Sequence, residues 1–365
     1  MLKKILILVL AMLGLSLSAQ KPAYKLLVGT YNTDKSEGIY ALTLDKNGRA
    51  ISKTLLAKTD NPSFLAFSPD RKQVYAVNES AESGVTAFGF DKDKNTLTFL
   101  NRISLGNAGP CYVTTTDHHV ITANYGNGTI SVLGRRADGS LTDTVQTIKH
   151  RGKIFAPKRF GASNVHQTLF SPNGKMLIAT NLGKDCIYSY AYNPTAEKEP
   201  LKLLDEKVLT KNSGPRHAVF SKNGKILYLL NELSAGITVF EITTDGKFNI
   251  LQQTSAVNDS TLSNGAADIH LSPDGNYLYA TNRGTANDIT CFKVGKNGRL
   301  TKQFSTSTGG NAPRNFAISP DGKFIFIGNQ KTNNISVFSR DAATGKLQLL
   351  PEKIEMGAPV CLLFY

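Results

Sequence analysis

Five side chains in this sequence have the types needed for acid–base chemistry on an anionic substrate. They are one imidazole, one carboxylate and three guanidinium groups: His166, Glu232, Arg216, Arg283 and Arg314. An imidazole titrates near neutral pH and can act as a general base, and arginine binds carboxylate or phosphate groups through paired hydrogen bonds. Three arginines around one carboxylate are more than a structural salt bridge needs, so the set predicts a small-anion site. The alternative is that these are ordinary charges at the rim of a fold.

The five residues stand out because they interrupt an internal repeat. A turn, an apolar run and a closing Asn recur along the chain with a period of about 50 residues. The closing residues, called corner Asn below, are Asn78, Asn124, Asn181, Asn231, Asn282 and Asn329. Short β-rich runs separated by Asn-Gly and Asp-Gly turns at this period indicate a β-propeller with four antiparallel strands in each blade.

The repeats amount to seven if the two ends of the chain are joined. Residues 24–58 supply three strands without a leading strand, and residues 359–365 look like a leading strand with nothing after it. Pairing these segments would close the ring and remove two exposed sheet edges. The sequence therefore predicts an all-β, seven-bladed β-propeller that forms one domain over residues 20–365, with the C-terminal strand completing the N-terminal blade.

Two positions in the repeat were compared from blade to blade. The leading-strand position lies five residues before the turn Ser, and from blade one to blade seven it holds Val360, Ser63, Cys111, His166, Arg216, Ala267 and Arg314. The corner position follows the corner Asn, and in blades two to seven it holds Glu79, Tyr125, Leu182, Glu232, Arg283 and Gln330. Both positions open at one end of the central channel of a propeller, so we expect them to converge there. A purely structural role would repeat one residue type around the ring, which neither position does.

Composition narrows the choice of partner. The chain has 42 Lys plus Arg against 28 Asp plus Glu, a formal net charge of +14, but the basic residues are scattered through turns. Nucleic-acid binding would need a basic run or patch, so we expect a small anionic partner instead. The other explanation of the charge is solubility. We also expect a monomeric chain. The four cysteines form no C-x-x-C pair, and no metal or cofactor motif is present. We therefore expect neither a metal nor a cofactor.

The N-terminus has the pattern of a secretory signal. Lys3 and Lys4 precede an apolar stretch over residues 5–15, and residues 16–19 are mostly small. The apolar stretch is too short to remain as a membrane-spanning helix. The sequence thus predicts that residues 1–19 are removed and that the protein is exported, to the periplasm where a cell has two membranes, without stable insertion in the membrane.

Motifs across the whole mature chain carry a family resemblance. They are Gly29-Thr30-Tyr31, Asn78-Glu79, His166, Gly214-Pro215-Arg216-His217, Asn231-Glu232-Leu233, residues 266–275, Asn282-Arg283-Gly284, Pro313-Arg314-Asn315-Phe316 and Asn329-Gln330. In these motifs the sequence resembles the seven-bladed lactonase family typified by the propeller-type 6-phosphogluconolactonase. The family includes a fungal enzyme that cyclises carboxymuconate to its lactone, with a His, two Arg and a Glu as its proposed catalytic group. By motif position these correspond to His166, Arg216, Glu232 and Arg283.

The resemblance implies metal-independent hydrolysis of a sugar lactone to the open-chain acid. His166 would be the general base on a water, Arg216 and Arg283 would stabilise the oxyanion and the developing carboxylate, and Glu232 would orient an arginine or the water. The residues expected to contact substrate are Arg314, His217, Glu79, Asp268, Asn282 and Gln330. Where family members often carry His-x-His, this chain has Asn164-Val165-His166, which offers one histidine. The alternative function is a non-catalytic exported propeller that binds a sugar acid or a protein partner.

Overall fold

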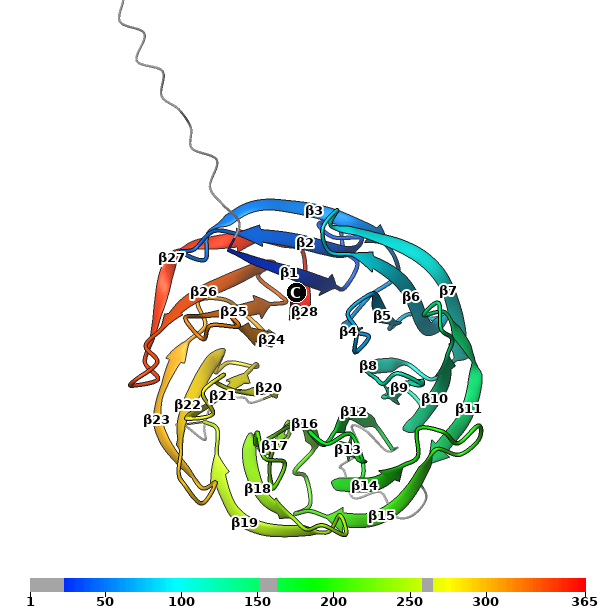
Figure 1. Cartoon of the computed structure of the whole chain (residues 1–365). Coiled ribbons are helices and arrows are strands. Elements are labelled where there is room, and N and C mark those ends of the chain that lie inside the picture. The colour runs from blue at the N-terminus through cyan, green and yellow to red at the C-terminus, as the bar shows by residue number, and fades with distance from the viewer. Residues whose placement is uncertain (1–22, 151–162, 258–264) are drawn as a thin grey trace, which may run out of the picture.

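The computed structural model describes residues 23–150, 163–257 and 265–365. These residues form 28 strands in seven four-stranded antiparallel sheets arranged as blades around a central channel (Figure 1). The prediction of a seven-bladed β-propeller is therefore confirmed. The described residues include no helix, and hence none long and apolar enough to cross a membrane. The predicted signal segment, residues 1–19, lies outside the described residues.

The four strands of each blade lie side by side, in order from the channel to the rim. From blade one to blade seven, the innermost strands are β28 (Pro359–Phe364), β4 (Phe64–Phe67), β8 (Pro110–Thr115), β12 (Val165–Phe170), β16 (Pro215–Phe220), β20 (Ala266–Leu271) and β24 (Pro313–Ile318). The second strands are β1 (Tyr24–Thr30), β5 (Gln73–Asn78), β9 (His119–Asn124), β13 (Met176–Asn181), β17 (Ile226–Asn231), β21 (Tyr277–Asn282) and β25 (Phe324–Asn329).

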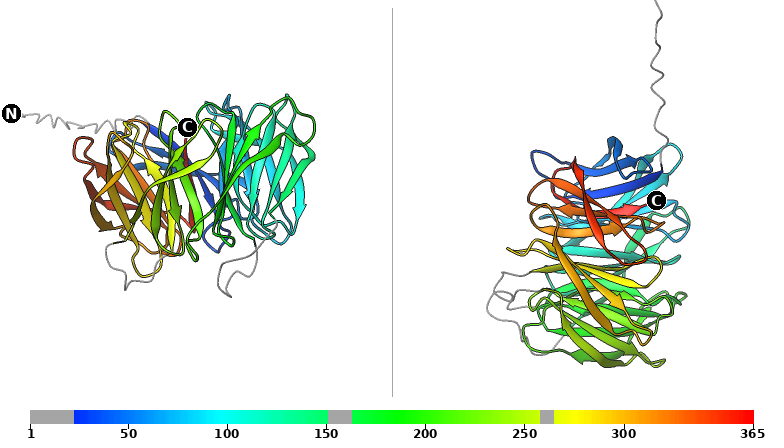
Figure 2. Two further views of the ribbon diagram at one scale, coloured as in Figure 1. Left: turned by 90° about the horizontal axis from the view of Figure 1, so that it is seen from below. Right: turned by 90° about the vertical axis from the view of Figure 1, so that its left-hand side faces the viewer.

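The two outer positions of each blade follow the same order. The third strands are β2 (Gly38–Leu44), β6 (Ser83–Asp91), β10 (Thr129–Arg135), β14 (Cys186–Tyr192), β18 (Gly236–Ile242), β22 (Asp288–Val294) and β26 (Asn334–Arg340). The rim strands are β3 (Ala50–Lys58), β7 (Thr96–Gly106), β11 (Leu141–Lys149), β15 (Leu201–Val208), β19 (Phe248–Ser255), β23 (Leu300–Ser307) and β27 (Leu347–Glu355). Figure 2 shows the ring edge-on as a thick disc, with the strands running across its thickness.

The C-terminal strand closes the ring in the predicted way. Strand β28 pairs antiparallel with β1, with Leu27 opposite Leu363 and Gly29 opposite Cys361. The first blade therefore combines the last strand of the chain with the first three. The inner edge of β1 is paired with β28, so the two ends of the chain are joined in one sheet.

Apolar residues hold neighbouring blades together. The buried hydrophobic side chains form seven clusters, each shared by two adjacent blades. Strands β5, β9, β21 and β25 are buried along their whole length, because each second strand lies between two neighbouring blades. The rim strand β15 instead alternates between exposed and partly buried residues over much of its length, as expected for a strand with one face in water.

Polar residues of the repeat define its turns and corners. In blade six, Ser272 Oγ donates to Asp274 at 2.6 Å and accepts from the Tyr277 N–H at 3.0 Å, which closes the turn before the second strand. At the corner that follows the second strand of blade three, the Asn124 side-chain amide donates to Thr129 and Ser131 at 2.8 and 2.9 Å. The corner Asn of blade three is thus structural.

Candidate active site

Backbone hydrogen bonds bring the leading-strand and corner positions together in every blade. In all seven, the corner N–H donates to a carbonyl two residues before the leading-strand position, over 2.6 to 3.1 Å. In blade five, Glu232 donates to the carbonyl of Gly214, just before Arg216. Gly214 has φ +65°, and a Cβ there would lie 2.5 Å from Leu233 Cγ, so this connection requires glycine. The predicted convergence of the two positions is therefore confirmed at the level of the backbone.

The leading-strand position is also a β-bulge. In blade five, Pro215 pairs with Asn231 and His217 pairs with Leu230, so Arg216 has no partner in the second strand. The innermost strands of blades one, three, four, six and seven skip the same position. A bulge bends the strand and redirects the side chain of the extra residue. This geometry explains how a residue such as His166 faces the cavity while its successor lies in another layer of the channel.

A cavity of about 270 Å³ lies where the two positions meet. Its lining residues are Tyr31, Glu79, Cys111, Tyr125, His166, Glu232, Arg283, Arg314 and Gln330. The structure thus brings together six of the predicted site residues, and the fully buried Arg216 contacts two of these, His166 and Glu232. The volume lies just below the roughly 300–1,000 Å³ of sites for drug-sized molecules, so the cavity suits a small ligand.

His166 and Arg216 form the most buried contact of the site. Arg216 Nη1 lies 3.1 Å from His166 Nδ1 and also contacts Nε2. A guanidinium only donates hydrogen bonds, so it needs an unprotonated imidazole nitrogen as acceptor. Burial, reinforced by the charge of Arg216, lowers the pKa of His166 well below its ordinary value. The imidazole is therefore neutral at pH 7, with its lone pair engaged by Arg216.

Glu232 connects this pair to Arg283. Its Oε2 atom accepts from Arg283 Nη2 at 3.0 Å and lies 3.5 Å from Arg216 Nε. Burial raises the pKa of Glu232, but the charges of Arg283 and Arg216 outweigh it and bring the pKa below its ordinary value. Burial lowers the pKa of Arg216 to about 10, which leaves the guanidinium protonated at neutral pH. One carboxylate thus neutralises part of the charge of two arginines.

A second polar group lines the opposite side of the cavity. Arg314 Nη2 donates to the Tyr31 hydroxyl at 2.9 Å, and that hydroxyl donates to Glu79 Oε2 at 2.7 Å. The Arg314 guanidinium also lies 5.3 Å from the centroid of the Tyr31 ring. Burial opposes the charged form of Arg314, but Tyr31 and Glu79 outweigh this effect and raise its pKa. Arg314 is therefore a fixed positive charge held by neighbours on both sides.

Two tyrosines that line the cavity are not among the predicted site residues: the blade-to-blade comparison missed Tyr31, and it included Tyr125 without assigning it to the site. Tyr31 holds the corner position of blade one, where its N–H donates to the Ala358 carbonyl at 3.1 Å. It was missed because Thr30 stands where the other blades have Asn, so the corner motif is absent there. Joining the C-terminal strand to blade one before comparing corners would have revealed it. Tyr125 occupies a compared position, and its ring lies edge-on to His166 with centroids 5.5 Å apart.

Three predicted substrate contacts do not line the cavity. Asn282 is fully buried and donates to the Ala256 carbonyl at 3.0 Å and to Asp288 at 2.7 Å, so it holds its corner instead. His217 and Asp268 are also buried, and they bond to each other, with His217 Nδ1 2.8 Å from Asp268 Oδ1. Both lie in the next layer of the channel.

That next layer, called the lower ring, consists of the residue after the leading-strand position in each blade. From blade one to blade seven its members are Cys361, Phe64, Tyr112, Gln167, His217, Asp268 and Asn315. Each member touches the following blade by a ring stack or a polar contact, and the contacts return to the starting blade. The lower ring therefore forms a closed circuit of contacts that fills the channel beside the cavity.

The sulfur atoms fit structural positions. All four cysteines are buried and free, and burial raises the pKa of Cys111 beside His166, so it is a thiol rather than a thiolate. Within residues 23–150, 163–257 and 265–365, no group of three or more His, Cys, Asp or Glu side chains is placed to hold a metal ion.

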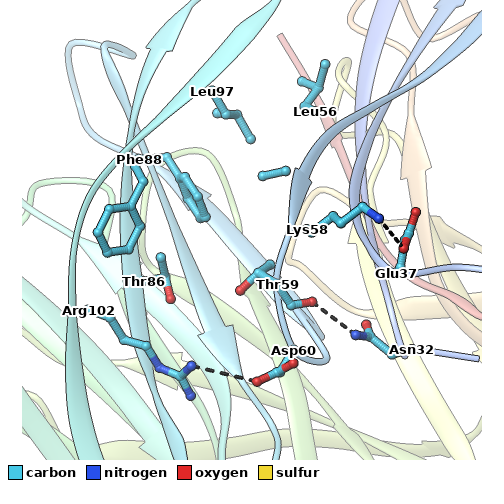
Figure 3. A pocket seen from close by; sticks show the side chains of 12 residues that line it. Asn32, Glu37, Leu56, Lys58, Thr59, Asp60, Thr86, Phe88, Leu97 and Arg102 are labelled. Carbon is cyan, nitrogen blue, oxygen red and sulfur yellow. Dashed lines mark hydrogen bonds and ion pairs between the residues drawn. The ribbon is translucent and has the colours of Figure 1, made fainter.

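A larger hollow lies at the rim between blades one and two (Figure 3). Its charged groups pair with one another, Lys58 with Glu37 at 2.9 Å and Arg102 with Asp60 at 3.8 Å. Most of these side chains are open to water, where such pairs contribute little. Among the described residues that line the hollow there is no histidine and no buried charge, so the channel cavity is the candidate active site.

Fold and site together define a propeller with a small, charged cavity lined by corner residues of six blades and leading-strand residues of three, among them His166 of blade four. A family model described as lactonase, 7-bladed beta-propeller, matches residues 25–364. The chain belongs to this lactonase family.

Relatives named as lactonases cover nearly the whole chain. A 6-phosphogluconolactonase of Bacillus subtilis is 34% identical over 354 residues, covering 92% of this chain and 97% of the relative. Another from Formosa agariphila is 33% identical over 338 residues, covering 90% and 95%. The structure of a periplasmic gluconolactonase from Pseudomonas aeruginosa matches with a TM-score of 0.88 and 33% identity, over 93% of this chain and 98% of that one.

Proposed function

We propose that this protein is a metal-independent lactonase that hydrolyses a sugar lactone to the open-chain acid. The observation that carries the proposal is the neutral imidazole of His166, which lines a small cavity together with Arg283 and Arg314. A neutral imidazole can remove a proton from water, and fixed guanidinium groups stabilise an oxyanion. The two 6-phosphogluconolactonases among the relatives support the same reaction class.

The reaction needs one base and one oxyanion site. His166 takes a proton from water as the water oxygen attacks the lactone carbonyl carbon, and Arg283 stabilises the resulting oxyanion. The ring C–O bond then breaks, and His166 returns the proton to the departing ring oxygen, which becomes a hydroxyl. Collapse leaves the carboxylic acid and hydroxyl of the open-chain product; the acid then releases its proton to solvent, and Arg283 stabilises the carboxylate that forms.

Arg216 acts from behind His166 rather than from the cavity wall. Its contact with the imidazole keeps His166 neutral but also engages the lone pair that the base must use. We propose that Arg216 shifts this hydrogen bond from His166 to Glu232 as the imidazole takes up the proton. Glu232, between Arg216 and Arg283, then compensates the added positive charge.

The opposite wall would select the substrate. Arg314 offers a positive charge, and Glu79 and Gln330 offer hydrogen-bonding groups suited to sugar hydroxyls. We further propose that residues 1–19 direct export, so the substrate is a sugar lactone outside the cytoplasm. The name of the Pseudomonas aeruginosa relative, a periplasmic gluconolactonase, supports an unphosphorylated lactone.

The test is a pH-stat assay of the purified protein on glucono-1,5-lactone and 6-phosphogluconolactone, with and without EDTA. We expect turnover of at least one lactone, unaffected by EDTA, and a loss of at least about 100-fold in His166→Ala. The control is His118→Ala, which removes an exposed histidine from a turn and should leave the rate unchanged. Thermal shifts with gluconate but no turnover would contradict the proposal and favour a non-catalytic binding protein.

A further inference from the structure

One lower-ring residue, His217, lies directly against the base. The His217 ring lies edge-on to His166, with centroids 5.2 Å apart and an interplanar angle of 72°. Tyr112 and Phe64 also lie edge-on to His217, at 5.4 and 6.2 Å. His217 is therefore enclosed by rings from three innermost strands, which leaves it little freedom to rotate. Any change in its plane would press on His166.

Asp268 fixes the protonation of His217. The Asp268 carboxylate is buried and accepts from the N–H groups of Ile269 and Phe316 at 3.0 and 3.1 Å. Its contacts with His270 and His217, at 2.9 and 2.8 Å, outweigh the effect of burial and hold the pKa of Asp268 below its ordinary value. An ionised carboxylate only accepts, so His217 Nδ1 must carry a hydrogen.

The charges around His166 show why a buried anion matters there. Arg216 touches it from β16, and Arg283 and Arg314 act on it from the corner of blade six and from β24. The neighbours Cys111, Tyr125 and His217 are uncharged at neutral pH. When His166 accepts a proton, the imidazolium must form among three cations. Glu232 pairs with two of these cations, and Asp268 is reached through His217.

We propose that Asp268 and His217 are positioning residues for His166. The carboxylate sets the tautomer and plane of His217, and the His217 ring holds His166 toward the cavity. Asp268 also places a negative charge behind His217, which itself lies against His166, and this charge favours the imidazolium during hydrolysis. The inference rests on the proposed lactonase function, but it concerns residues that do not line the cavity.

The test compares Asp268→Asn and His217→Phe with the control Cys361→Ser. His217→Phe keeps a ring of similar shape and removes the bond to Asp268, and Cys361 is a lower-ring member in blade one whose sulfur accepts from the Leu65 N–H. We expect kcat to fall about 10-fold or more in the first two variants, with KM within about threefold, since misplaced catalytic groups cost rate rather than binding. Cys361→Ser should keep both values.

Two further measurements separate positioning from general damage. The acid limb of the pH–kcat profile should move to lower pH in Asp268→Asn, because losing an anion makes His166 harder to protonate. The ¹⁵N shifts of the His166 ring should change in Asp268→Asn and His217→Phe but not in Cys361→Ser. The inference fails if either kcat or these shifts keep their parent values in both variants. If Asp268→Asn does not fold, His217→Phe decides; if no variant or parent hydrolyses a lactone, the ¹⁵N shifts alone decide.

Discussion

Consecutive residues of the same innermost strands build two layers with different properties. Lower-ring members such as Gln167 and Asn315 find hydrogen-bond partners in the neighbouring blade. At the leading-strand position, by contrast, Ser63 Oγ and Arg216 Nε are buried without a hydrogen-bond partner. Buried polar atoms are usually satisfied, so each exception calls for an explanation; the corner residues Asn231, Asn282 and Asn329 also leave Oδ1 unpaired. The comparison shows a closed structural layer supporting an incomplete chemical one.

The β-bulge is the feature that separates the two layers. In a regular strand, alternate residues face opposite sides, so His166 and Gln167 would both belong to the ladder with the second strand. Because the bulge removes His166 from that ladder, the residue type there is free to vary from blade to blade. The following variants test whether function and stability divide along this line outside His217 and Asp268, the two lower-ring residues that we propose to act through His166, starting with the largest expected effect.

Removing Glu232, the carboxylate shared by Arg216 and Arg283, should lower both the stability of the fold and the activity. Glu232→Ala leaves Arg216 and Arg283 without their common counter-ion, and uncompensated buried charge typically costs about 3–5 kcal/mol of folding free energy. Urea unfolding measures the loss, with the exposed Glu241→Ala as the control. Stability equal to that of the parent would mean that the arginine pair needs no anion.

Removing one cavity arginine should affect activity far more than stability. Arg283→Ala deletes the proposed oxyanion donor, and loss of such a donor costs about 100-fold or more in kcat. Steady-state kinetics on the preferred lactone give this ratio, and a thermal melt reports the fold. A change in KM alone, with kcat preserved, would assign Arg283 to ligand binding instead.

Removing a lower-ring amide should have the opposite outcome. Asn315 accepts from the Leu362 N–H at 2.7 Å and donates to Asp268 at 2.5 Å. Asn315→Ala leaves that N–H unpaired inside the protein, at a cost of about 1–3 kcal/mol. We expect urea unfolding to show this loss while kcat stays within about threefold of the parent, because Asp268 keeps its charge and its bond to His217 through the other carboxylate oxygen. A large fall in kcat without a loss of stability would break the division between the layers.

The pH dependence of activity should be shallow near neutrality. Because the pKa of His166 is lowered, its imidazole stays unprotonated at pH 6.5. That pH equals the ordinary pKa of histidine, at which a free side chain would be half protonated. The acid limb of kcat/KM should therefore lie below pH 6.5, with little change from pH 8 to 6.5. An acid limb at or above pH 6.5 in the parent enzyme would show that His166 is not the neutral base described here.

The sequence predicted the fold because its repeat is both local and periodic. The turn from Ser272 to Gly275 and the corner at Asn124 each have a recurring hydrogen-bonding pattern, so their spacing determines the blades. Ring closure followed from an unpaired strand pattern at each end of the chain. The same periodicity identified His166 and Arg283, because they depart from the residue types found at equivalent positions.

What the sequence could not predict depends on side-chain direction. His217 and Asp268 carry functional groups and stand next to leading-strand positions, but the bulge places them in a different layer from Arg216. Nothing in the residue types indicates on which side of a bulge a side chain lies. Likewise, the contact of Arg216 with the His166 imidazole arises between two blades and leaves no local pattern.

The most direct measurement compares two neighbours on β12. His166→Asn keeps a polar acceptor near Arg216 but cannot act as the base, and Gln167→Leu keeps similar bulk but leaves the Ala218 N–H, now bonded at 2.6 Å, without an acceptor. We predict that His166→Asn loses at least about 100-fold in kcat/KM with little change in Tm, whereas Gln167→Leu lowers Tm by several degrees and keeps kcat/KM within about threefold. The reverse pattern, or equal effects on both quantities, would contradict the account.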